Sequence, residues 1–129
     1  MAKRVGTATL LLENTPSVEA FGAIGSKREA EGPLGGFFDQ LCSDSTMGEQ
    51  TWEKAECRLQ KDAINVALKK ANLSPPDLQY IFAGDLLNQC TSSTYGLRDL
   101  GVPFVGLYGA CSTMAESLSL ASLFIEGGF

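Results

Sequence analysis

The clearest pattern of hydrophobic and polar positions lies in residues 51–72. Apolar side chains recur there at steps of three and four, which places them on one face of a helix; they are Trp52, Ala55, Leu59, Ala63, Val66 and Ala67. Asn72 suits a helix end, and Pro75 and Pro76 block any continuation. We therefore predict an amphipathic helix over 51–72, which Trp52 anchors in a core.

Two later runs, 79–84 and 104–108, are apolar on both faces, which is typical of strands in a parallel sheet. Between them, residues 93–100 predict a short helix that Gly101 and Pro103 stop. Residues 113–126 predict a last helix that is apolar or small on nearly every side, as in the interior of a larger assembly. This order predicts an α/β fold, a layered α/β/α arrangement around a mostly parallel sheet.

The first third of the chain has a weaker pattern. Residues 7–13 and 17–23 are β-prone, and the turn signal at 14–16 between them predicts a hairpin. Residues 22–36 are rich in glycine and charge, and we interpret them as a long surface loop. The alternative is a binding loop, since long loops in compact domains are often functional.

Composition narrows the class of protein. The chain has 129 residues, enough for one modest core. Its net charge of −5 disfavours contact with a phosphate backbone, so no nucleic-acid partner is expected. No apolar run reaches the roughly 18 residues of a membrane-spanning helix. The four cysteines form no CxxC pair, so we expect reduced thiols, no metal and no cofactor. The sequence contains no histidine, so imidazole chemistry would have to use a residue from elsewhere.

Polar residues follow both predicted parallel strands. Asp85 and Asn88 come after the first, and Cys111, Ser112 and Thr113 come after the second. Ligands in parallel sheets usually bind at these carboxyl ends. A strand-to-helix turn exposes a side chain, and the helix dipole beside it favours thiolate, so Cys111 is a candidate nucleophile. The alternative is a structural cysteine buried in the core.

Several motifs carry a resemblance to known families. The sequence YGACST at 108–113 resembles the nucleophile region of thiolases and β-ketoacyl synthases, and LSPPDLQYI at 73–81 resembles their helix-to-strand connection. Four motifs together are similar to the stage V sporulation protein AD family of spore-forming bacteria: GPLG at 32–35, WE at 52–53, AGDLLNQ at 83–89 and GACST at 109–113. The resemblance covers residues 7–129. It implies a thiolase-like fold of which residues 1–129 form a partial N-terminal domain, with the C-terminal half absent, so we expect a fragment.

The resemblance also implies a function. Such a protein binds dipicolinic acid and helps its uptake, with calcium, into the developing spore, working with other stage V sporulation proteins that include membrane subunits. The implied ligand-binding residues are Asp85, Asn88, Cys111, Ser112 and Thr113. The implied location is cytoplasmic or peripheral at the spore inner membrane, and the implied assembly is a homodimer through the edge strand near 103–108.

Two alternatives stay open. The thiolase and ketoacyl-synthase resemblance implies an acyltransferase in which Cys111 is catalytic. That activity is not expected of this chain alone, because the chain has no histidine. In the other alternative Cys111 belongs to the core and the domain serves only in dimerisation.

Overall fold

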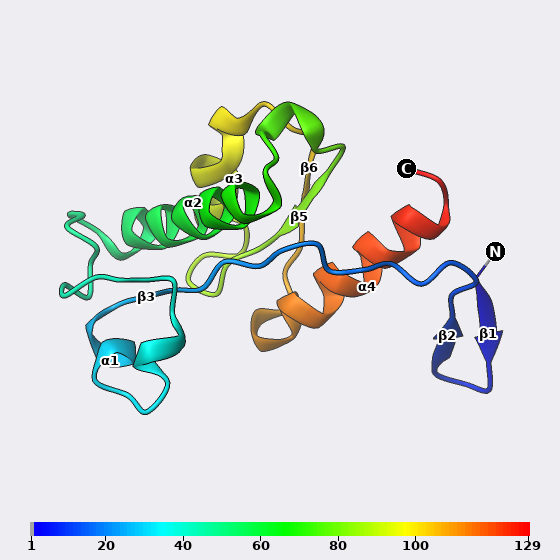
Figure 1. Ribbon diagram of the computed structural model, residues 1–129, viewed down its shortest axis with the longest axis horizontal. Coiled ribbons are helices and arrows are strands. Elements are labelled where there is room, and N and C mark those ends of the chain that lie inside the picture. Colours follow the sequence, from blue (N-terminus) through cyan, green and yellow to red (C-terminus); the bar gives the residue numbers. More distant parts are fainter. Residues whose placement is uncertain (1) are drawn as a thin grey trace.

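The computed structural model of the protein describes residues 2–129 and has a mixed α/β architecture. At its centre β5 (Ile81–Ala83) and β6 (Phe104–Gly106) pair in parallel, with Phe82 opposite Val105. Helices α2 (Trp52–Ala71) and α3 (Thr91–Leu97) lie on one side of this pair, and α4 (Thr113–Glu126) lies on the other (Figure 1). The predicted α/β class with parallel strands is therefore confirmed.

Helix α2 confirms the helix predicted over 51–72. The Thr51 side chain accepts a hydrogen bond from the Lys54 amide at 3.3 Å, which satisfies one free N–H of the first turn. Asn72 ends the helix in the left-handed conformation, with φ of 56°. Ala55 and Leu68 are buried, as members of an inner face should be.

The predicted role of Trp52 is wrong. Its side chain is 58% exposed, because it lies at the first helical position, where the chain comes in from an exposed turn. Ala55, one turn later, is the first residue of the helix to reach the interior.

The short helix predicted over 93–100 begins earlier than predicted and ends as predicted, before Gly101. Helix α3 starts at Thr91, and its last turn tightens into a 3₁₀ turn, η3 (Arg98–Leu100). Gly101 then reverses the chain with φ of 67°, which glycine adopts without strain. Helices α2 and α3 approach closely at Gly96, where an added Cβ would lie 3.0 Å from the Cys57 Cα.

Helix α4 packs against β5 through aromatic rings. The Phe124 ring lies 5.0 Å from that of Tyr80 and 4.8 Å from that of Phe82, in edge-to-face arrangements. The other side of the helix is open, and Met114 is 74% exposed. Within the described residues α4 is covered on one side only, and its place inside a larger assembly stays a prediction.

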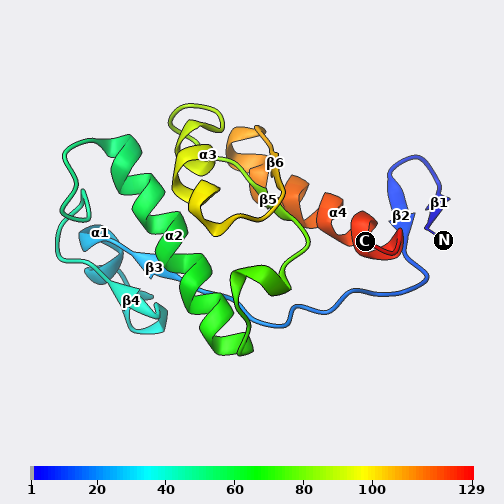
Figure 2. The ribbon, with the colours of Figure 1, turned by 90° about the horizontal axis from the view of Figure 1, so that it is seen from above.

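The predicted hairpin uses a different pair of strands. Strand β2 (Thr9–Leu11) pairs antiparallel with β1 (Lys3–Val5), which precedes it, and not with residues 17–23. The reversal occurs at Gly6, which has φ of 63°. Residues 15–23 instead run extended past α4 towards α2, as both views show (Figures 1 and 2). Glu126 holds the start of this segment by accepting the Asn14 amide at 2.9 Å.

The segment 22–36 is more ordered than the predicted surface loop. It contains β3 (Ile24–Gly25), α1 (Lys27–Ala30) and the 3₁₀ turn η1 (Gly35–Phe37), and β3 pairs in parallel with β4 (Gln40–Leu41). The glycines permit this compact path: an added Cβ at Gly35 would lie 2.8 Å from the Ala30 carbonyl oxygen.

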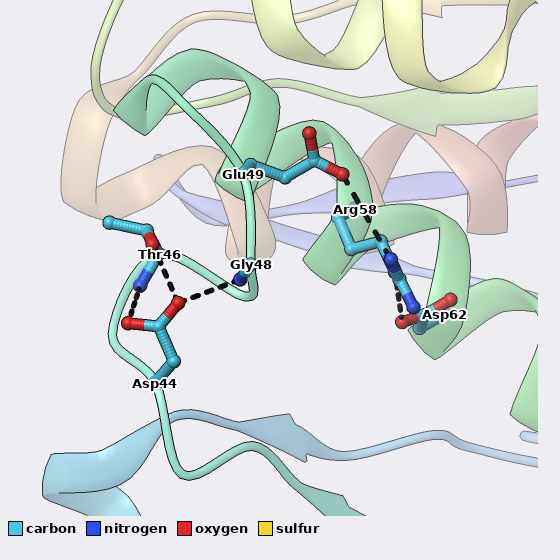
Figure 3. Close-up of polar contacts among 6 residues, drawn as sticks. All are labelled: Asp44, Thr46, Gly48, Glu49, Arg58 and Asp62. Carbon is cyan, nitrogen blue, oxygen red and sulfur yellow. Dashed lines mark hydrogen bonds and ion pairs between the residues drawn. The ribbon is translucent and has the colours of Figure 1, made fainter.

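The turn before α2 is held by one carboxylate. Asp44 accepts hydrogen bonds from the Thr46 amide and hydroxyl and from the Gly48 amide, at 3.2, 2.7 and 2.8 Å (Figure 3). Arg58 of α2 lies between Glu49 and Asp62 in the same view. These ion pairs are exposed, so the geometry of the Asp44 turn contributes more to the path of the chain than they do.

Two other aspartates have comparable partners. Asp39 receives the Lys70 ammonium at 2.6 Å and the Ala23 amide at 2.9 Å. Asp77, in the 3₁₀ turn η2 (Pro75–Asp77), accepts from the Ser74 hydroxyl and amide. In each case the hydrogen bond from a side chain is the largest cause that lowers the carboxyl pKa below its usual value of 3.8.

These carboxyls predict acid sensitivity. The hydrogen bond from Thr46 likewise lowers the pKa of Asp44. A carboxyl whose pKa is lower in the folded state than in the unfolded state stabilises the protein at pH values above its unfolded-state pKa. That stabilisation is lost as the pH falls through the folded-state pKa. We expect the thermal midpoint to be level between pH 7 and about 5 and to fall below about pH 4. Melting curves followed by circular dichroism measure it, and a level midpoint down to pH 3 would contradict the prediction.

Candidate functional site

The two predicted site segments lie side by side because the strands before them are parallel neighbours. Ala83 is opposite Gly106, and the ladder continues with the Leu107 amide, which donates to the Ala83 carbonyl at 3.0 Å. The chain then leaves β5 through Gly84, where an added Cβ would lie 1.8 Å from the Leu107 carbonyl oxygen. Residues 84–89 and 107–113 therefore start from the same edge of the sheet.

Asp85 is buried, with only 3% of its surface exposed. One carboxylate oxygen accepts from the Ser93 amide at 2.9 Å and its hydroxyl at 2.7 Å, and the other accepts from the Ser92 amide at 3.3 Å. Asp85 thus supplies an acceptor for the free N–H groups at the start of α3. The structure gives this residue the role of a helix cap, and its predicted contact with a ligand stays a prediction.

Asn88 lies in the loop between Asp85 and α3. The loop is closed by the Asp85 amide, which donates to the Gln89 carbonyl at 2.9 Å, and Gln89 itself has φ of 59°. Asn88 is exposed, as are Leu86 and Leu87 beside it. The loop therefore presents a polar amide and two apolar side chains to solvent at the carboxyl end of β5.

The second segment forms a tight elbow, which we define as residues 107–113. The chain turns through η4 (Ala110–Ser112) directly into α4, and Ala110 has φ of 49°, a strained value for a residue with a Cβ. The Ser112 hydroxyl donates to the Gly109 carbonyl at 2.7 Å, and the Gly109 amide donates to the Thr113 hydroxyl oxygen at 3.1 Å. These two bonds fix the turn from both sides.

Cys111 is exposed on this elbow, next to the start of α4. The structure therefore places it outside the core and at the end of a parallel strand, which contradicts the alternative of a cysteine buried in the core. Ser112 is also exposed, whereas Thr113 is half-buried because its hydroxyl holds Gly109. An added Cβ at Gly109 would lie 2.2 Å from the Ser112 hydroxyl and 3.0 Å from a Glu116 carboxylate oxygen, so a larger residue there would displace these two side chains.

Two of the other cysteines, Cys57 and Cys90, are part of the packing. The Cys57 thiol donates to the Ser92 carbonyl at 3.0 Å; burial raises its pKa, and the negative charge of Asp85 adds to this rise. The Cys90 thiol donates to the Leu107 carbonyl at 3.2 Å and so faces the interior of the elbow. This contact links the residue after the 85–89 loop to the first residue of the elbow.

An apolar hollow of about 440 Å³ lies elsewhere, between α2 and β5. Its lining includes Ala63, Ile64, Tyr80 and Phe82, and no residue of the elbow. Within residues 2–129 no group of three or more His, Cys, Asp or Glu side chains is placed to hold a metal ion. In that same range no helix combines the length and the apolar character that crossing a bilayer requires.

Comparison with known proteins identifies the family. A family model described as stage V sporulation protein AD (SpoVAD) matches residues 6–129. The chain belongs to the stage V sporulation protein AD family. It is 40% identical over 127 residues to the stage V sporulation protein AD of Bacillus subtilis (strain 168), a match that covers 98% of this chain and 38% of that relative. Membership of the SpoVAD family supports a role in sporulation, and the chain spans well under half the length of its curated relative.

Proposed function

We propose that this chain binds dipicolinic acid at the elbow and helps its uptake, with calcium, into the developing spore. The observation that carries the proposal is the exposed turn around Cys111 at the start of α4, in a chain of the SpoVAD family. The family resemblance supplies the identity of the ligand, and the geometry supplies a place for it.

The start of a helix suits a dicarboxylate. Backbone N–H groups point outward there, and the helix dipole favours negative charge. Ser112, the residue that precedes α4, makes no capping hydrogen bond from its side chain to the first turn, since its hydroxyl turns back to Gly109. The Ser112 and Thr113 amides already donate to the Gly109 and Ala110 carbonyls, so we propose that an anion here binds amides further along the first turn of α4, near the Cys111 thiol.

Asp85 opposes the binding of a dicarboxylate less than its negative charge implies. A carboxylate next to a dicarboxylate is normally repulsive, but this one is buried and accepts three hydrogen bonds from α3. Residues 107–116 contain Glu116 and neither lysine nor arginine. We propose that calcium accompanies the ligand as its counter-charge, with Asn88 offering an amide oxygen from the neighbouring loop.

The wider assignments belong to the same proposal. We propose that residues 1–129 form the N-terminal part of a thiolase-like fold and that two copies pair through the edge near 103–108. Other stage V sporulation proteins, including membrane subunits, would hold the protein peripherally at the spore inner membrane. Acyl transfer by Cys111 is less favoured, because no residue of this sequence is a histidine.

Calorimetry on the protein produced from its complete gene tests the ligand. We expect saturable heat with dipicolinate, stronger when calcium is present. Cys111→Trp should weaken binding by more than about tenfold because the ring would occupy the elbow, and a factor of ten corresponds to 1.4 kcal/mol. Thr7→Trp is the matched control on the exposed hairpin turn. Absence of heat at millimolar dipicolinate, with and without calcium, would refute the proposal.

A further inference from the structure

Cys90 joins the two loops of the candidate site. It follows the loop 85–89 directly, and α3 starts at the next residue. Its thiol donates to the Leu107 carbonyl at 3.2 Å, at the point where β6 passes into the elbow. One side chain thus connects the segment after β5 with the segment after β6.

The backbone around the Cys90–Leu107 hydrogen bond is closely packed at both Gly106 and Gly84. An added Cβ at Gly106 would lie 3.2 Å from the Cys90 sulfur, and an added Cβ at Gly84 would lie 1.8 Å from the Leu107 carbonyl oxygen. The Leu107 peptide is therefore held between the backbone of Gly84 and the thiol of Cys90. Leu107 is itself buried and lies two residues before Gly109, where the turn towards Cys111 begins.

Cys90 is also fixed at its own backbone. Its carbonyl accepts the Thr94 amide at 2.8 Å and the Thr94 hydroxyl at 2.6 Å. Because Asp85 caps the same helix, a movement of Cys90 would have to move α3 with it. The Cys90 backbone is therefore fixed by α3, and its thiol holds the Leu107 carbonyl in a fixed position relative to that helix.

We infer that Cys90 is a positioning residue for the ligand site: its thiol fixes the Leu107 carbonyl and thereby the distance between the 85–89 loop and the elbow. The inference rests on the proposed function, because it assigns Cys90 to the same site. Cys90 does not touch the ligand, since its sulfur faces the strand beneath the turn.

The chain provides a matched control in Cys57. That thiol also donates to a backbone carbonyl, Ser92 at 3.0 Å, and is similarly half-buried. Its contact lies between α2 and α3, so it does not reach the elbow. Removal of either thiol costs one bond of the same kind, whereas only Cys90 acts on Leu107.

The test compares Cys90→Ala, Cys90→Ser and Cys57→Ala in the protein produced from its complete gene. Three quantities are measured: dipicolinate affinity by calorimetry, the rate at which iodoacetamide alkylates Cys111, and the thermal midpoint. We expect Cys90→Ala to weaken dipicolinate binding about five- to tenfold and to change the alkylation rate at least threefold. Cys90→Ser keeps a hydrogen-bond donor. Both Cys90→Ser and Cys57→Ala should stay within twofold of the wild type in dipicolinate affinity and in the alkylation rate of Cys111.

Two results would overturn the inference. In the first, Cys90→Ala stays within twofold of the wild type in both dipicolinate affinity and the alkylation rate of Cys111. In the second, Cys57→Ala changes these two quantities as much as Cys90→Ala does. If the wild type itself does not bind dipicolinate, the proposed ligand fails, and the alkylation rates alone still decide whether Cys90 positions the elbow. If Cys90→Ala does not fold, Cys90→Thr and Cys90→Val replace it, because they share one shape and only threonine donates.

Discussion

Replacing Gly84 with alanine should unfold the centre of the molecule. The new Cβ would lie 1.8 Å from the Leu107 carbonyl oxygen and 3.0 Å from the Thr113 methyl carbon, and the nearer of these is backbone that cannot rotate away. Overpacking usually costs about 1–3 kcal/mol, and a clash with the backbone of a paired strand should exceed that range. Urea denaturation of the protein produced from its complete gene measures the loss.

Gly36→Ala is the control for this change. An added Cβ at Gly36 meets nothing within 4 Å, so the variant should stay within about 0.5 kcal/mol of the wild type. If Gly84→Ala were as stable as Gly36→Ala, β5 and β6 would not approach as described, and the elbow would lose its support.

Asp85→Ala should cause the second large loss. The substitution leaves the Ser93 amide and hydroxyl and the Ser92 amide without their acceptor in a buried place. Hydrogen bonds to a charged group contribute about 1.5–3 kcal/mol each and helix caps about 1 kcal/mol, so we expect a loss of about 2–4 kcal/mol. Asp85→Asn keeps one acceptor oxygen and should lose about half as much.

The Asp85 variants also separate a structural role from direct contact with the ligand. A cap alone predicts that Asp85→Asn, once folded, binds dipicolinate nearly as well as the wild type. A weakening of binding by more than tenfold in a folded Asp85→Asn protein would show that the carboxylate touches the ligand or its calcium. Unchanged stability in Asp85→Ala would contradict the cap.

The sequence predicted those elements that local signals determine. Helix α2 has its apolar stripe, its Thr51 cap and its Asn72 end within 51–72, and the structure confirms that range. The parallel strands and the exposed elbow followed from apolar runs with small residues after them. In each case the residues that decide the structure are close in the sequence.

The failures share a different cause, because contacts between distant residues decided them. Residues 17–23 are β-prone, but Glu126 holds the segment before them, and an added Cβ at Gly22 would lie 2.2 Å from the Ala63 carbonyl oxygen, so the segment runs along α2. Lys70 and Asp39 likewise join α2 to the start of β4 across a long stretch of chain. No local pattern predicts such pairs.

The candidate site was predicted in outline but not in detail. Their places after the two parallel strands identified Asp85 and Cys111 as candidate site residues. Only the structure shows that the Asp85 carboxylate accepts hydrogen bonds from Ser92 and Ser93 at the start of α3. The sequence gives no sign of the role of Cys90, because only the structure shows that its thiol donates to the Leu107 carbonyl. Gly84 carried a usable signal: a glycine directly after a buried strand often marks a close approach of two backbones.

Protection of Cys111 by dipicolinate is the most direct test of the site. The protein produced from its complete gene is treated with iodoacetamide at increasing dipicolinate, with calcium present, and alkylation of each cysteine is quantified by mass spectrometry. The account predicts that Cys111 reacts readily without ligand and is protected in a saturable way. Cys42, a half-buried cysteine that precedes α2 in the sequence, should be alkylated at the same rate throughout. Alkylation of Cys111 that is unaffected by saturating dipicolinate, or a Cys111 that does not react at all, would contradict it.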